Sequence, residues 1–76
     1  MASLDVRPTL AAGGEPFDEI MRAIAALAPG EDLELIAPFE PMPLYDVLAR
    51  RGFEHVARPL GDGAGFAVTF RRAGHA

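Results

Sequence analysis

One amphipathic segment, residues 16–28, restricts the fold of this chain more than any other part of the sequence. Its apolar side chains recur every three or four residues, so they form a single stripe along a helix. They are Phe17, Ile20, Met21, Ile24, Leu27 and Ala28. Pro16 stands at the expected first helical position, and Pro29-Gly30 ends the helix. A helix with one apolar stripe must pack on another apolar surface, which here we expect to be a sheet.

The first half of the chain also contains two strand patterns. Residues 4–7 alternate apolar and charged side chains, which predicts a short strand with one buried face. Pro8 ends this strand because it cannot donate to a ladder, and residues 9–14 are predicted to form a loop of small side chains. Residues 33–37 form a second strand with partial cover on both faces.

The second half of the chain begins with a proline-rich connection. Residues 38–43 contain three prolines, which predicts a stiff, extended segment. A second helix follows, with Leu44, Val47 and Leu48 on its inner face and Gly52 just after its end. Residues 54–60 have a weak alternation, typical of an edge strand.

A glycine-rich segment, residues 61–65, then leads into the clearest strand pattern, residues 66–72. The glycine segment joins two strands, contains no lysine and precedes no helix, so we predict a hairpin turn and not a phosphate-binding loop. The residues after Arg72 are expected to form a frayed tail.

These elements assemble into an α/β (α+β) two-layer sandwich in the order β-α-β-α-β-β, a four-stranded mixed sheet with two helices on one face. We expect one domain over residues 1–76, with an ordered core over about residues 3–72. The open face of the sheet is predicted to be mostly polar, and a homodimer could form there. Its expected residues are Asp5, Arg7, Glu34, Thr69 and Arg71, with Ile36 and Ala67 as apolar members.

The charge of the chain is unevenly distributed. The net charge of −4 argues against binding to nucleic acid or to an anionic membrane. Residues 1–48 carry nine acidic residues and two arginines, whereas residues 49–76 carry two acidic residues and five arginines. These arginines are either ordinary solvated residues or a contact for an anion or a partner. They are Arg50, Arg51, Arg58, Arg71 and Arg72.

The residue types that are absent exclude several kinds of chemistry. With no cysteine and no lysine, the chain has no disulfide, no thiolate nucleophile and no Schiff-base amine. His55 and His75 have no second histidine at ligand spacing, so we expect neither a metal nor another cofactor. No segment resembles a signal peptide or a transmembrane helix, and we expect a cytoplasmic protein.

Several short segments resemble, in order and spacing, the TusA/SirA family of sulfur-relay domains across about residues 3–72. These segments are Leu4-Asp5-Val6-Arg7, Glu15-Pro16, Ala28-Pro29-Gly30-Glu31 and Phe66–Arg72. The resemblance implies the same two-layer fold. In the sulfur carriers of the family a Cys-Pro pair precedes the Glu-Pro pair, and here Gly13 and Gly14 take those places. The resemblance therefore does not imply sulfur transfer by a thiol of this chain.

The sequence is also similar to a cysteine-less branch of uncharacterised bacterial domains. Pro41-Met42-Pro43-Leu44 fits the Pro-x-Pro-Leu ending of a segment in that branch. Pro38-Phe39-Glu40 stands where the branch has an Asp/His-rich stretch, so no metal or haem role follows. Members resemble accessory domains found near hemerythrin-like and respiratory or denitrification proteins. This resemblance implies an accessory role in a redox, respiratory or sulfur-handling system.

The best candidate surface is the edge where the first two strands end and both helices begin. Ligands of open α/β sheets favour the carboxyl ends of strands, and helix N-termini attract anions. The expected binding residues are Arg7, Gly13, Gly14, Phe39, Glu40, Met42 and Tyr45. Phe39 and Met42 are large apolar residues on a stiff connection, and they either cap the core or contact a ligand or partner.

Three functions remain open at this point. The first is a non-catalytic module that binds a protein partner or a small ligand. The second is a sulfur-relay accessory that docks to a cysteine-bearing partner. The third is an enzyme that uses Arg7 and the carboxylates of Asp5, Glu15 and Glu40. A domain this small has little room for a pocket of about 300 Å³, which favours the first function.

Overall fold

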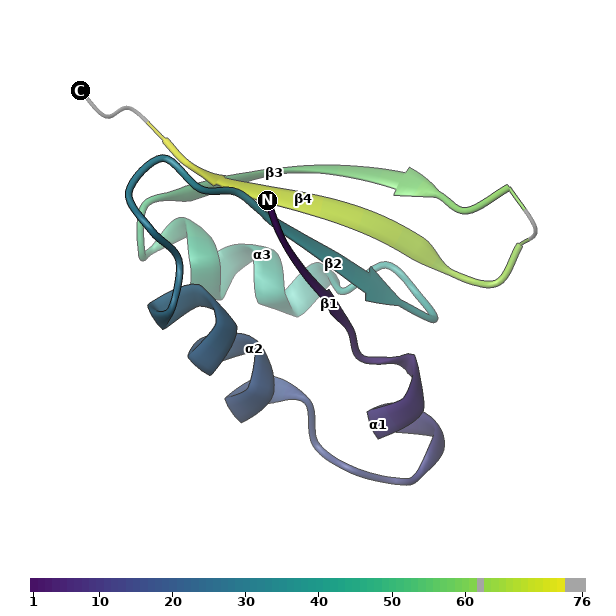
Figure 1. Ribbon diagram of the computed structural model, residues 1–76. Helices are drawn as coiled ribbons and strands as arrows, with labels where there is room; N and C mark the ends of the chain where they lie inside the picture. The colour runs from purple at the N-terminus through teal and green to yellow at the C-terminus, as the bar shows by residue number, and fades with distance from the viewer. Residues whose placement is uncertain (62, 74–76) are drawn as a thin grey trace.

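The computed structural model describes residues 1–61 and 63–73. In these residues four strands and three helices follow one another along the chain. They are β1 (Ala2–Asp5), α1 (Arg7–Ala11), α2 (Phe17–Ala25), β2 (Leu33–Ala37), α3 (Met42–Ala49), β3 (Phe53–Pro59) and β4 (Phe66–Arg72). All three helices lie on one side of the sheet (Figure 1). The predicted fold class, a two-layer α/β sandwich with a four-stranded mixed sheet, is confirmed.

The strands lie in the order β1-β2-β4-β3. β1 and β2 are parallel, whereas β4 runs antiparallel to both of its neighbours, β2 and β3. In the middle of the sheet Leu35 of β2 pairs with Leu4 on one side and with Val68 on the other. β3 lies at one edge, as its weak alternation predicts.

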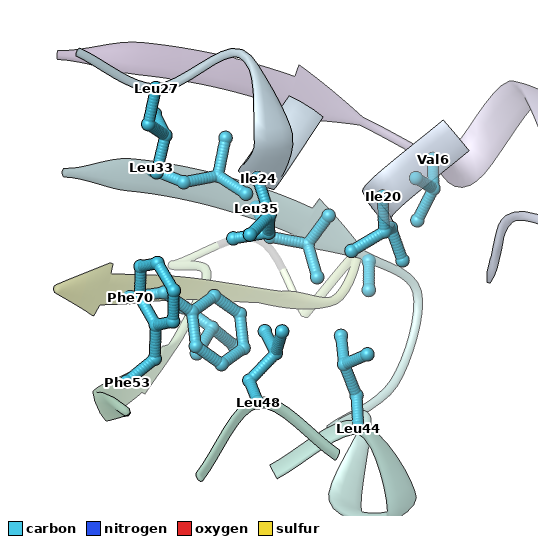
Figure 2. Packing of buried hydrophobic residues seen from close by; sticks show 12 residues of the cluster. Val6, Ile20, Ile24, Leu27, Leu33, Leu35, Leu44, Leu48, Phe53 and Phe70 are labelled. Atoms are coloured by element: carbon cyan, nitrogen blue, oxygen red, sulfur yellow. The ribbon is translucent and has the colours of Figure 1, made fainter. Parts of the chain in front are cut away.

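The core lies between the sheet and the helices. The sheet contributes Leu33, Leu35, Val68 and Phe70, each at most 1% exposed. Figure 2 shows side chains of α2 and α3 meeting these residues from the other layer. They are Ile20, Ile24, Leu44 and Leu48. Every residue that is fully buried in the described chain is apolar, so the hydrophobic effect accounts for the packing of the two layers.

The structure corrects the prediction for residues 6–14. β1 ends at Asp5, and α1 occupies part of the predicted loop of residues 9–14. Pro8 lies in the first turn of α1, where its missing N–H costs no hydrogen bond. The N–H of Leu10 donates to the carbonyl of Val6 at 3.1 Å, and the Leu10 side chain packs against the core. Arg7 is therefore a helical residue and does not belong to a strand on the open sheet face.

The boundaries of the other two helices also differ from the predictions. α3 begins at Met42, so the predicted extended segment of residues 38–43 already ends in a helical turn. Pro43 is compatible with this turn because the first N–H groups of a helix have no acceptor within the helix. α2 begins at Phe17, one residue after the predicted start, and ends at Ala25, before the predicted stop. Leu27 lies beyond this end and is still buried.

Some positions of the sequence analysis lie outside the described residues: Asp62 of the glycine-rich turn, and Gly74, His75 and Ala76 of the expected tail. Within residues 1–61 and 63–73, none of the helices reaches the length and apolar character that crossing a bilayer requires.

Candidate functional site

A groove of about 210 Å³ opens between the first turns of α2 and α3 and the connection that precedes α3. Its lining residues are Glu15, Pro16, Phe17, Ile20, Phe39, Pro41, Pro43, Leu44 and Val47. Glu15 is the only member of this set with a charged side chain. The groove lies near the ends of β1 and β2, because α1 and α2 follow β1 while α3 follows β2 (Figure 1). This is the edge that the sequence predicts as the binding surface.

The floor of the groove belongs to the core, whereas its walls reach solvent. Ile20 and Leu44 are 4% and 8% exposed, and Figure 2 shows Ile20 near Val6 and Leu44 next to Leu48. Phe17 and Phe39, in contrast, are 41% and 55% exposed. The apolar surface therefore runs from the core to solvent without a polar barrier.

Local bonds and prolines hold the walls in place. The N–H of Phe17 donates to Oε1 of Glu15 at 2.8 Å, which satisfies one of the unpaired donors at the start of α2. The N–H of Met42 donates to the carbonyl of Glu40 at 2.9 Å. Pro41 and Pro43 fix their backbone φ angles on either side of this turn. The groove is preformed, so little chain entropy is lost when it is filled.

Among the seven predicted site residues, Phe39 lines the groove. Met42 lies at the start of α3 and is 60% exposed, but it is not one of the lining residues. Glu40 and Tyr45 lie beside the groove and are joined by a hydrogen bond. The other three predicted residues, Arg7, Gly13 and Gly14, belong to α1 and to the loop between α1 and α2.

The Arg7 side chain forms a bidentate ion pair with Asp5. Its Nε donates to Oδ1 of Asp5 at 3.0 Å, and its Nη2 donates to Oδ2 at 2.8 Å. The backbone N–H of Arg7 also donates to Oδ1, at 2.9 Å. These hydrogen bonds lower the pKa of Asp5 below its ordinary value, the side-chain bond having the larger effect. Asp5 is therefore ionised at neutral pH, and it holds the Arg7 guanidinium next to its own strand.

The two glycines shape the turn between α1 and α2. Gly13 has a φ of +81°, which is unfavourable for a side chain with a Cβ. Gly14 lies close to Thr9: its N–H donates to the Thr9 carbonyl at 2.9 Å, and a Cβ at Gly14 would lie 3.1 Å from that oxygen. The turn therefore favours glycine at both positions. These are the positions where the sulfur carriers that the sequence resembles have a Cys-Pro pair.

Tyr45 forms a small polar cluster beside the groove. Its hydroxyl donates to Oε2 of Glu40 at 3.1 Å, and its ring stacks on that of His55 with centroids 3.6 Å apart. Burial, together with the neighbouring Glu40 carboxylate, raises the pKa of Tyr45 to about 12. Tyr45 is a hydrogen-bond donor at neutral pH and is poorly suited to act as a base. His55 is an exposed residue of β3.

The three carboxylates considered for acid–base chemistry have three different partners. Asp5 accepts from Arg7, Glu15 from the N–H of Phe17, and Glu40 from the Tyr45 hydroxyl. No group of three or more acidic or histidine side chains suited to a metal ion occurs in the part of the chain that the structure describes. The groove offers an apolar surface and not a set of converging reactive groups.

The arginines of the second half are divided among different environments. Arg58 pairs with Glu34 at 3.0 Å, and Arg71 pairs with Asp32 at 3.3 Å. The guanidinium of Arg72 lies 4.9 Å from the ring centroid of Phe53. Arg50 and Arg51 are exposed at the end of α3. A joint anion site formed by these arginines stays a prediction.

Most of the groove residues are not among the site residues predicted from the sequence. Phe17 is the most informative of them, because it belongs to the apolar stripe of α2 but is 41% exposed. A usable signal is that Phe17 follows Pro16 at the very start of its helix, where a side chain can extend past the end of the core. The remaining members resemble ordinary inward-facing or capping residues in the sequence.

Comparison with known proteins gives a family for this chain. The family model described as an uncharacterized conserved protein (DUF2249) matches residues 3–72. No curated protein and no solved structure matches the chain. Because the match covers nearly the whole sequence, with its strands, its helices and its groove, the chain belongs to the DUF2249 family of uncharacterized conserved proteins.

Proposed function

We propose that this protein is a non-catalytic interaction module that binds a partner protein through the groove between α2 and α3. The observation that carries the proposal is the continuous apolar surface from buried Ile20 and Leu44 to exposed Phe17 and Phe39. Exposed aromatic side chains around a concave apolar surface are typical of contact sites for other proteins. The prolines on both sides of the groove support the same function, because a rigid site loses little entropy on binding.

The size of the groove favours a protein side chain over a metabolite. Pockets for small organic ligands usually have volumes of about 300–1,000 Å³ and contain several converging polar groups. The groove has a volume of about 210 Å³ and one charged lining residue, Glu15. This volume suits one large apolar side chain of a partner, inserted as the central residue of a larger contact.

The side chains near the groove support a non-catalytic function. The Glu15 carboxylate accepts a hydrogen bond from the helix backbone, and Tyr45 keeps its proton at neutral pH because its pKa is about 12. General acid–base catalysis needs a group whose pKa lies near the working pH. Apolar lining residues cannot supply such a group.

A finer version of the proposal makes the module an accessory of a sulfur-handling, redox or respiratory system. It is supported by the TusA/SirA resemblance over about residues 3–72 and by the observed β-α-β-α-β-β order, to which α1 is added. The chain has no cysteine. In this version the partner carries the thiol, and the protein docks to it through the groove. Incubation with a persulfide donor should then leave the intact mass unchanged, and a gain of one sulfur would contradict this version.

The main test compares two groove variants with a variant on the other layer. Phe39→Ala and Phe17→Ala shorten the walls, and Val56→Ala removes an apolar side chain that is 66% exposed on β3. Tagged proteins are used to capture partners from the native host, and each captured protein is then purified and titrated against all variants by calorimetry.

We expect each groove variant to weaken binding about tenfold or more, as is usual for a central aromatic contact, and Val56→Ala to bind like the original protein. Equal affinities for all the variants would show that the groove is not the binding surface. Loss of binding by Val56→Ala alone would assign the contact to the sheet face.

A further inference from the structure

Eight of the ten acidic residues in the described chain fall into two groups. In the first group, a carboxylate pairs with an arginine at 3.3 Å or less. These pairs are Asp5–Arg7, Asp32–Arg71 and Glu34–Arg58. All three carboxylates lie on β1, on β2 or directly before β2. Their negative charge is balanced within the molecule.

The second group lies on the segments that form the groove. Five carboxylates either line the groove or adjoin a lining residue in the sequence: Glu15, Asp18, Glu19, Glu40 and Asp46. None of the five forms an ion pair with a described residue, and no arginine adjoins a lining residue in the sequence. Hydrogen bonds to three of them come from uncharged donors: the Phe17 N–H, the Thr9 hydroxyl and the Tyr45 hydroxyl. Asp18 and Asp46 each have an arginine one helical turn later, at Arg22 and Arg50. Glu15, which lines the groove, and Glu40, between two lining residues, have no such neighbour, so their negative charge is unbalanced.

The helix dipole explains only part of this arrangement. Asp18 and Glu19 lie in the first turn of α2, where negative side chains are stabilised by about 0.3–1 kcal/mol each. The positive end of a helix is equivalent to about half an elementary charge, so it does not neutralise several carboxylates. Asp46 lies within α3, away from its first turn, and gains nothing from a dipole. The negative charge on the segments that form the groove is therefore larger than the helix dipoles can neutralise.

We infer that the partner segment that fills the groove carries one large apolar side chain flanked by arginine or lysine residues. This inference rests on the proposed function and adds the chemistry of the partner to it. The apolar side chain enters the cavity between Phe17 and Phe39, and the basic side chains meet the carboxylates of Glu15 and Glu40. Such complementarity mainly raises the association rate and the selectivity for basic partners, and salt weakens it.

A second copy of the chain does not fit this description well. The large apolar side chains that are exposed in the described residues are Met1, Phe17, Phe39, Met42 and Val56. Among these only Val56 has an arginine within two positions, and Val56 lies in the middle of β3, where its backbone is paired with β4. Val56 has an arginine on one side only and projects from a broad sheet surface, which fits a narrow groove less well than a side chain on a separate peptide segment. The partner is therefore a different protein.

The test uses a phage-displayed library of random peptides selected on the immobilised full-length protein. Binders to the Phe39→Ala variant are removed in each round. We expect the surviving peptides to share an apolar residue with arginine or lysine on at least one side. The strongest peptide is then synthesised in three forms: unchanged, with its basic residues replaced by serine, and with its apolar residue replaced by alanine.

Affinities are measured by fluorescence anisotropy at low and high NaCl concentrations. We expect serine replacement to weaken binding about tenfold at low salt, and this loss to shrink at high salt. The double variant Glu15→Gln/Glu40→Gln keeps both hydrogen-bond acceptors and should remove most of the difference between the basic and serine forms. Its matched control, Glu54→Gln, changes an exposed acid on β3 and should preserve the difference.

The outcomes separate the two proposals. Phe39-dependent peptides without basic residues, or equal affinities of the basic and serine forms, would overturn the charge inference and leave the proposed function standing. A peptide that binds as tightly after alanine replacement would also overturn the inference, because attraction by charge alone would explain it. If no Phe39-dependent peptide is enriched, both proposals fail. A concentration-dependent dimer that Phe39→Ala abolishes would replace the foreign partner by a second copy.

Discussion

The open face of the sheet and the groove both combine apolar and charged side chains, but they differ in exposure. On the sheet face Ala67 is only 1% exposed, although no helix lies on that side (Figure 1). Its neighbours in register are Ile36 and Arg58, and Arg58 pairs with Glu34 across the sheet. In the groove Phe39 is 55% exposed, and its acidic neighbours form no ion pairs with residues that the structure describes.

This difference teaches how a small domain can keep one surface available for binding. Long side chains that pair with each other lie over the apolar residues between them and shield them from water. Within the described chain, the carboxylates near the groove have no paired arginine whose long side chain would cover the apolar surface. Around Ala67 the sheet face is therefore shielded by its own side chains, although Val56 on the edge strand is 66% exposed, whereas the groove has no such cover from the described side chains around it.

The largest expected effect concerns the junction between the two regions. Gly65 has a φ of +143°, and a Cβ there would collide with the carbonyl oxygen of Ala37, where β2 leads into the groove segment. Gly65→Ala should lower the free energy of unfolding by about 3 kcal/mol, through backbone strain and this collision. Gly61→Ala, which meets no atom, is the control and should change stability by less than about 0.5 kcal/mol. Similar urea midpoints for the two variants would refute the role of Gly65.

The next prediction concerns the hydrogen bond beside the groove. The pKa of Tyr45 is about 12 in the folded protein, above its ordinary value of 10.0. A raised pKa means that the contribution to stability is complete below pH 10 and is lost as the pH rises through about 12. Tyrosinate absorbance measures this titration without interference, because the chain has one tyrosine and no tryptophan.

Glu40→Gln is the matched variant for this titration, since it keeps an acceptor but removes the charge. The pKa of Tyr45 should then fall toward its ordinary value, while burial still keeps it raised. A folded protein whose tyrosine titrates like that of the denatured chain would contradict the contact between Tyr45 and Glu40.

A smaller effect is expected on the sheet face. The Arg58 and Glu34 side chains are 58% and 27% exposed, so their attraction is strongly screened by water. A double-mutant cycle with Arg58→Ala and Glu34→Ala should give a coupling energy of about 0.2–1 kcal/mol, reduced by added salt. The same cycle with Arg50→Ala in place of Arg58→Ala is the control and should show no coupling. An absent or salt-independent coupling for the first pair would weaken the explanation of the shielded sheet face.

The smallest expected change in stability is at the groove itself. Because Phe39 is more than half exposed, Phe39→Ala should change the free energy of unfolding by about 0.5 kcal/mol or less, as should Val56→Ala on the sheet face. Leu48→Ala, at a residue that is 0% exposed, should cost about 2–5 kcal/mol. If Phe39→Ala costs as much as Leu48→Ala, Phe39 caps the core, and the groove loses its main argument as a binding surface.

The layers of the fold follow from periodic patterns in the sequence. The stripe of α2 and the alternation in β4 are visible because their buried residues repeat at fixed intervals. Two of the differences between the predicted and the observed elements occur at prolines. Pro8 was interpreted as the end of a strand and Pro43 as part of an extended segment, whereas both lie in first turns of helices. A proline has the same backbone φ in both settings, so local sequence does not distinguish them.

The position of the groove follows from the sequence, but its lining follows only in part. Strand order places the edge at which the groove lies, and Phe39 is recognisable as a large apolar residue on a stiff connection. The opposite wall, Phe17, could not be separated from the core stripe, because periodicity does not show where the neighbouring layer ends. The stacking of Tyr45 on His55 depends on how α3 packs on β3, which no local pattern encodes.

The position of β4 has a consequence for how the molecule is made. β4 is the last of the four strands in the sequence, yet it lies between β2 and β3. Until Phe66–Arg72 leaves the ribosome, β3 has no neighbour in the sheet and β2 has only one. A nascent or prematurely terminated chain that stops before this strand cannot assemble the sheet, so incomplete products should be recognised as unfolded and degraded.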